Sequence, residues 1–176
     1  ISAGFPEGYW SATGNLEART LSIGGICEDA IAGVLSGISS YGQHVGVASS
    51  YGAFMAPLGH IAARLHAIGA HARHIATGNP YNPIVMVCAH AGLKTGEDGP
   101  THADPQPLQL LQRGSQQGPY FAGLPWRQSN SHSFGEIWPL LAASLQKRPA
   151  VIAPFVTRPN EKILDRQKLG LAPVQA

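Results

Sequence analysis

One glycine-rich segment, residues 85–105, carries two histidines together with acidic side chains. No other stretch of this sequence has as many side chains that could take part in catalysis. Among its polar side chains are His90, Lys94, Thr95, Glu97, Asp98, Thr101 and His102. For Thr101 or Glu97 alone we favour a role in a turn network. Two imidazoles and a carboxylate on one glycine-pinned loop instead favour a ligand-binding or catalytic site, where groups that exchange protons gather.

A buried strand is predicted to hold this segment in place. Residues 84–88 form a short apolar run rich in β-branched side chains, which gives way to Gly92, Gly96, Gly99 and Pro100. Such a pattern is typical of a strand that ends in a turn-rich loop. In α/β proteins ligands bind in the crevice beyond the carboxyl ends of the strands, so we expect the site there.

A second candidate lies at the start of a predicted helix. Apolar residues recur at three- and four-residue steps at Ile26, Ala30, Ile31, Val34, Leu35 and Ile38. We interpret Asp29 as a favourable charge at the positive end of this helix. Glu28 stands between Gly24-Gly25 and an apolar run, and a carboxylate in such a setting needs a specific partner.

Strands and helices alternate along most of the chain. Further strands are predicted at 19–23, 44–50, 121–127 and 149–155, and further helices at 54–68, 108–111 and 134–145. This order predicts an α/β protein, a three-layer α/β/α arrangement with a mainly parallel sheet. We expect an irregular N-terminal arm over residues 1–18, one α/β domain over 19–159, and a C-terminal tail or linker over 160–176.

Two aromatic residues and four histidines near the predicted 54–68 helix allow more than one interpretation. Tyr51 and Phe54 fall where that helix begins, and core packing or ligand contact is equally open for each. The histidines are His60, His66, His71 and His74. No metal-binding motif surrounds them, so we expect solvated or helix-capping side chains and no metal site.

The run Gly96-Glu97-Asp98-Gly99-Pro100-Thr101-His102, with His90 twelve positions before its last residue, resembles the signature of the transketolase family. The resembling part is the pyrimidine-binding domain of these thiamine-diphosphate enzymes. The resemblance implies the three-layer fold of that domain. It also implies transfer of a two-carbon ketol unit between sugar phosphates.

The resemblance also implies cofactor contacts. Glu28 in GGICEDAIAGV matches the family's glutamate that hydrogen-bonds N1′ of the aminopyrimidine and lets it exchange a proton. Phe54, and less closely Tyr51, match aromatic residues that stack on the same ring. Pro57 stands where the family has a third aromatic residue.

The same resemblance assigns substrate contacts. It implies that His90 and His102 contact the hydroxyls of donor and acceptor sugars and assist proton transfers. It implies that Asp98 binds the 2-hydroxyl. Arg158 matches the family's phosphate-binding arginine, a role that suits the bidentate geometry of guanidinium.

The sequence has no Gly-Asp-Gly followed some twenty-odd residues later by Asn, the family's motif for magnesium and diphosphate. We therefore expect Mg²⁺ and the diphosphate to be held by a partner domain or subunit, in a dimer or larger assembly. A deoxyxylulose-phosphate synthase or keto-acid dehydrogenase subunit stays open as an alternative. A non-catalytic α/β regulatory module is another.

Composition narrows the functional classes. The chain has 176 residues, 44% hydrophobic and 12% charged, which is typical of one globular domain. Its net charge of +2 without charged runs gives no case for nucleic acid or a membrane surface as partner. Cys27 and Cys88 lie in apolar segments, which favours buried, reduced thiols and a cytoplasmic location.

Overall fold

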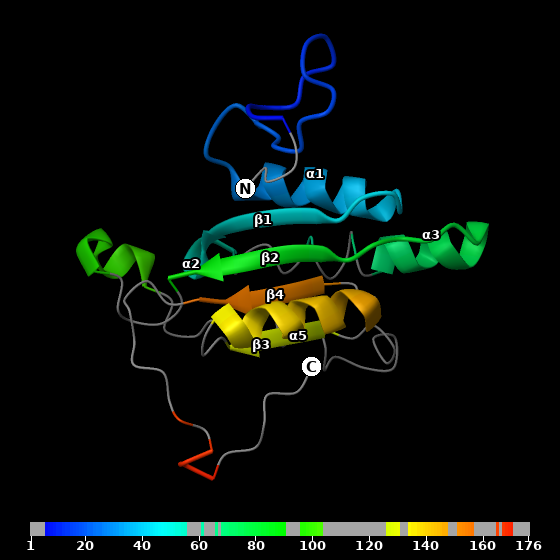
Figure 1. Cartoon of the computed structure of the whole chain (residues 1–176). Helices are drawn as coiled ribbons and strands as arrows, with labels where there is room; N and C mark the ends of the chain where they lie inside the picture. Colours follow the sequence, from blue (N-terminus) through cyan, green and yellow to red (C-terminus); the bar gives the residue numbers. More distant parts are fainter. Residues whose placement is uncertain are drawn as a thin grey trace.

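The structure is a computed structural model of the whole chain (Figure 1). It describes residues 6–55, 61, 66, 68–90, 96–103, 126–130, 134–147, 151–156, 165 and 167–170. The predicted helix at 108–111, the histidine at 60 and the arginine at 158 lie outside these residues. The description below concerns this part of the chain.

A parallel sheet forms the centre of the molecule. Its strands are β1 (Gly46–Tyr51), β2 (Ile84–Ala89), β3 (Trp126–Asn130) and β4 (Val151–Phe155). They pair in the order β1-β2-β4-β3, and every pair is parallel. The predicted parallel sheet is confirmed to this extent, and the central predicted strand matches β2 closely.

The helices are α1 (Glu28–Ser40), α2 (Gly52–Met55), α3 (Gly69–Thr77) and α5 (Phe134–Lys147), with 3-10 turns η3 (Gly96–Asp98) and η4 (Pro100–His102). Helix α1 contacts β1 and β2, and α5 contacts β3 and β4 (Figure 1). The fold is therefore α/β. No helix of the described part is both long and apolar enough to span a bilayer.

The core joins α1 to the sheet at close range. A Cβ atom on Gly46 would lie 2.7 Å from the carbonyl oxygen of Leu35 and 2.8 Å from its Cβ, so only glycine fits there. The amide of Gly46 also donates a 2.7 Å hydrogen bond to the hydroxyl of Ser39. The buried core cluster is Ala32, Ala48, Met55, Ile61, Ile84, Met86, Cys88, Val151 and Ala153.

Two predicted elements were wrong. A helix over residues 54–68 was predicted to end before Gly69. Instead the chain is helical at this point, because Ile68 has helical backbone angles and α3 begins at Gly69. Glycine has a low helix propensity, so Gly69 disfavours a helix start at this point. The next residue, Ala70, is buried, and its burial stabilises the helix. Residues 19–23 form no strand in the sheet, because Thr20 instead accepts a 2.7 Å hydrogen bond from the amide of Trp10.

Two predicted burials near the start of α1 were also wrong. Ile26 is 97% exposed, although its spacing placed it with the core-facing residues of the helix. Cys27 is exposed, and only Cys88 is buried; both are free thiols. Because Cys27 precedes the first turn of α1, neither residue is held against the sheet.

Candidate functional site

The candidate site lies at the carboxyl ends of β1 and β2. The arrowheads of the strands point to one side of the molecule, where α2 and residues 96–102 also lie (Figure 1). Tyr51 and Ala89 pair across the last rung of the two strands, and His90 follows immediately. Parallel pairing therefore brings the end of one strand to the beginning of the glycine-rich segment.

His90 holds an unusual backbone conformation. Its φ of 54° lies in the left-handed region that side chains other than glycine's rarely adopt, at a cost of about 1 kcal/mol or more. Its Nδ1 lies 3.6 Å from Oδ2 of Asp98, close enough for an ion pair when the imidazole is protonated. The same nitrogen is buried and makes no hydrogen bond within the described residues. The turn thus aims one polar imidazole atom toward a carboxylate without a direct hydrogen bond.

Tyr51 joins the two histidines of the site. Its ring centroid lies 4.1 Å from that of His90 and 4.8 Å from that of His102, both edge-on. Phe54 completes the cluster, 5.2 Å from the His102 ring and 5.6 Å from Tyr51. Edge-on packing of this kind fixes ring orientation, so the imidazoles are held on the two aromatic side chains.

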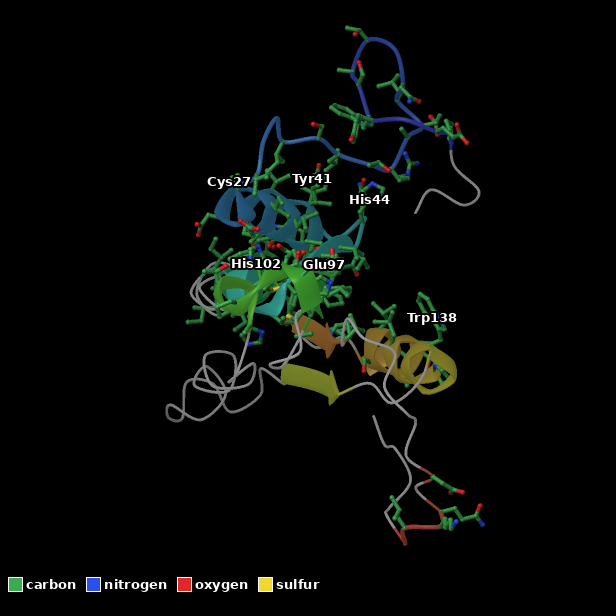
Figure 2. The ribbon with its side chains drawn as sticks, turned by 90° about the vertical axis from the view of Figure 1, so that its left-hand side faces the viewer. Cys27, Tyr41, His44, Glu97, His102 and Trp138 are labelled. Atoms are coloured by element: carbon green, nitrogen blue, oxygen red, sulfur yellow. The ribbon has the colours of Figure 1, made fainter. Side chains whose placement is uncertain are left out.

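The return of the chain to His102 depends on two short turns. Gly99 has a φ of 76° between η3 and η4, and its carbonyl accepts a 3.2 Å hydrogen bond from the amide of His102. The hydroxyl of Thr101 lies 2.9 Å from Nδ1 of His102, and it donates when that nitrogen carries no proton. In Figure 2, which views this side of the molecule, His102 and Glu97 lie in front of the sheet.

Glu28 reaches the same end of the sheet from α1. It is half-buried in the first turn, and its Oε1 accepts a 2.9 Å hydrogen bond from the hydroxyl of Ser50. No other hydrogen bond to this carboxylate is found within the described residues. Ser50 directly precedes Tyr51, so Glu28 and the ring cluster contact successive residues of β1.

Ser50 is a functional candidate that sequence reasoning missed. Side chains alternate between the two faces of a strand, and Gly46 contacts α1. Ser50 therefore faces α1 as well, opposite Glu28. In the sequence, the available signal was a polar residue near the end of a predicted strand. To see that this residue faces Glu28, one must also know how β1 is aligned against α1.

His66 is not solvated, contrary to the sequence-based expectation. It is fully buried, with the hydroxyls of Ser36 and Ser40 each 3.3 Å from Nδ1 and the carbonyl of Asn82 3.0 Å from Nε2. Because a carbonyl only accepts, Nε2 carries the proton and Nδ1 accepts. This imidazole links α1 to the segment before β2. His74 behaves as expected, since it is exposed and contacts the carbonyl of Asn79 at 2.9 Å.

The structure brings six of the seven predicted site residues to one end of the sheet. They are Glu28, Tyr51, Phe54, His90, Asp98 and His102. Arg158 lies outside the described residues. No group of three or more metal-ligating side chains occurs within the described part of the chain. Comparisons with protein-family models, curated proteins and solved structures give no match.

Proposed function

We propose that this chain is the pyrimidine-binding part of a transketolase-like enzyme that uses thiamine diphosphate. In this proposal the α/β fold is the three-layer pyrimidine domain, and the protein acts in the cytoplasm. The reaction is transfer of a two-carbon ketol unit between sugar phosphates. The sequence resemblance at Glu28 and at residues 96–102 supplies the chemical assignment.

One observation carries the proposal: Glu28 and the two histidines lie at the same end of the sheet. Glu28 contacts Ser50, the next residue Tyr51 packs against both imidazoles, and His90 lies beside Asp98. A reaction that needs an acid on the cofactor and proton-transferring groups on the sugar requires this proximity. An arrangement with the two regions at opposite ends would have excluded it.

The residues present fit the aminopyrimidine end of the cofactor. One oxygen of Glu28 is held by Ser50, which leaves the other to receive a hydrogen bond from or share a proton with a ring nitrogen. Phe54 is 37% exposed as a residue, and an accessible aromatic side chain can stack on a flat heterocycle. When bound, thiamine diphosphate supplies a stabilised carbanion equivalent, and Glu28 holds the proton at N1′.

In this proposal the sugar contacts the two histidines and Asp98. His90 and His102 have imidazoles, whose ring nitrogens can donate hydrogen bonds to sugar hydroxyls or accept hydrogen bonds from them. The carboxylate of Asp98 accepts hydrogen bonds from sugar hydroxyls, and its position beside His90 lets one group orient the other. Arg158 binds the phosphate in this proposal.

The proposal requires a partner for the diphosphate and Mg²⁺, as a domain or subunit in a dimer or larger assembly. A sister thiamine-diphosphate enzyme would retain the Glu28 contact but use another donor. A regulatory module would bind the partner without turnover. Neither alternative is favoured by a particular contact in the structure.

The direct test mixes the chain with the separately produced diphosphate-binding domain of a transketolase, thiamine diphosphate and Mg²⁺. Ketol transfer from a ketose phosphate to an aldose phosphate is then followed. We expect activity in the mixture and none with either component alone. Cofactor binding without ketol transfer would contradict the transferase assignment. Transfer from pyruvate in its place would support a sister enzyme.

A further inference from the structure

Tyr51 has three aromatic neighbours within the described residues. Their ring centroids lie 4.1 Å (His90), 4.8 Å (His102) and 5.6 Å (Phe54) from its own, and their planes are inclined to it by 83°, 69° and 60°. Inclined packing at such short range favours one orientation of each ring. Tyr51 thus contacts both imidazoles, whereas Phe54, in the same described part, contacts only that of His102.

The backbone places Tyr51 more firmly than it places either histidine. Tyr51 is the last residue of β1 and pairs with Ala89, the last residue of β2. His90 follows the sheet, and His102 ends the short turn η4. A side chain on a regular strand is fixed more precisely than one on a loop. Contact with Tyr51 therefore transfers orientation from the sheet to the two imidazoles.

The same contacts make Tyr51 a poor surface for a cofactor ring. A flat heterocycle stacks against a ring face, and three inclined neighbours compete with it for the two faces of Tyr51. Tyr51 is half-buried, whereas Phe54 is exposed and its two ring neighbours both lie beyond 5 Å. Phe54 is therefore the more accessible of the two residues for stacking.

We propose that Tyr51 is a positioning residue for the two histidines, and that Phe54 is the one of these two aromatic residues that stacks on the aminopyrimidine. This inference rests on the proposed function, and it divides a role that the sequence resemblance gives to both side chains. The Tyr51 ring holds the imidazoles of His90 and His102 where they hydrogen-bond the sugar. Its loss therefore lowers turnover and leaves cofactor affinity intact.

Matched leucine substitutions separate the two roles in assays with the partner diphosphate-binding domain and Mg²⁺. Tyr51→Leu should lower kcat for ketol transfer about tenfold or more at saturating cofactor, since misplacement by about 1 Å costs up to about a hundredfold. Its dissociation constant for thiamine diphosphate should stay within about twofold of wild type. Phe54→Leu should raise that constant about threefold to tenfold through lost stacking, and should lower kcat at saturation less than Tyr51→Leu does.

Two further variants show whether the ring is responsible. Tyr51→Phe keeps the ring and should recover most of the kcat that Tyr51→Leu loses. Val47→Leu, at an exposed position of β1, is the control and should keep wild-type kcat and cofactor affinity. Loss of kcat in Tyr51→Phe equal to that in Tyr51→Leu would assign the effect to the hydroxyl and overturn the role of the ring.

NMR of the wild-type chain alone separates this inference from the proposed function, because it uses neither cofactor nor partner. We expect nuclear Overhauser contacts from the ring protons of Tyr51 to those of His90 and of His102. Absence of either contact would overturn the positioning role, and this test stands even if Tyr51→Leu does not fold. Both contacts in a chain whose wild type transfers no ketol unit would refute the proposed function and not the contacts.

The kinetic result that would overturn the inference is equally specific. Urea unfolding first shows that Tyr51→Leu is folded under the assay conditions. A folded Tyr51→Leu with wild-type kcat would contradict the positioning role. A folded Tyr51→Leu that raises the cofactor dissociation constant as much as Phe54→Leu does would return Tyr51 to the cofactor.

Discussion

Nδ1 of His90 lies 3.6 Å from Oδ2 of Asp98, and both side chains are mostly withdrawn from solvent, with 21% and 25% of their surface exposed. The positive φ of His90 turns the imidazole toward this carboxylate at the point where β2 ends. Asp98 thus has two possible roles in the proposed reaction. It accepts a hydrogen bond from the sugar, and it stabilises a protonated His90.

Asp98→Asn should separate the charge of this residue from its shape. The amide cannot stabilise a protonated imidazole, so we expect kcat/KM for ketol transfer to fall about tenfold, the lower range for losing a charged partner. Cofactor affinity should not change. Glu97→Gln, an exposed neighbour in the same turn, is the control. Equal activities for the two variants would show that the His90–Asp98 pair has no catalytic part.

Ser50→Ala should weaken cofactor binding through Glu28. The variant removes the 2.9 Å hydrogen bond to Oε1 and leaves the carboxylate less well oriented. A hydrogen bond to a charged group contributes about 1.5–3 kcal/mol, so the dissociation constant for thiamine diphosphate should rise about tenfold or more in the presence of the partner domain. Ser49→Ala changes the exposed neighbour and should bind as wild type does. Indistinguishable affinities would remove Ser50 from the site.

His66→Ala should destabilise the fold without touching the site. The change removes a fully buried side chain and leaves the carbonyl of Asn82 and two serine hydroxyls without this partner. We expect the free energy of unfolding in urea to fall by about 2–5 kcal/mol. His44→Ala, at an exposed position, should change it by less than about 0.5 kcal/mol. A small effect at His66 would contradict its role as a link between α1 and the segment before β2.

Tyr81 should make stability fall at alkaline pH. Burial raises the pKa of its phenol above the ordinary value of 10.0. Below pH 10 the phenol is neutral in both states, and above it the unfolded chain loses the proton first. The free energy of unfolding should therefore decrease as pH rises from about 10 through the folded pKa. Tyr81→Phe should show a smaller decrease between pH 9 and 11 in urea titrations, and a decrease equal to that of wild type would refute this assignment.

The elements that sequence predicted well are those whose signal is local. Residues 84–88 form a short apolar run ended by turn residues, and β2 covers nearly the same span. The helix predicted at 134–145 matches α5 through its apolar spacing, although Pro139 lies inside the helix and not at its first position. The position of Glu28 in the first turn of α1 was also evident from local pattern.

The contacts that sequence could not give depend on pairing between distant segments. The Ser50–Glu28 hydrogen bond requires the register of β1 against α1. The role of Tyr51 between two imidazoles requires β1 and β2 to end together and residues 96–102 to fold back. The burial of His66 depends on serines some thirty residues earlier in the chain. The exposure of Ile26 was missed because α1 begins only at Glu28, so Ile26 lies ahead of the first turn and the helical spacing does not apply to it.

The most direct measurement of the central claim is ketol transfer by Glu28→Gln, assayed with the partner diphosphate-binding domain, thiamine diphosphate and Mg²⁺. Glutamine keeps the shape of the side chain and cannot exchange a proton with the aminopyrimidine. We expect kcat to fall by a factor of about 100 or more, within the range for losing a proton-transferring group, while Glu17→Gln at an exposed position of the arm retains wild-type activity. Undiminished transfer by Glu28→Gln would contradict the account.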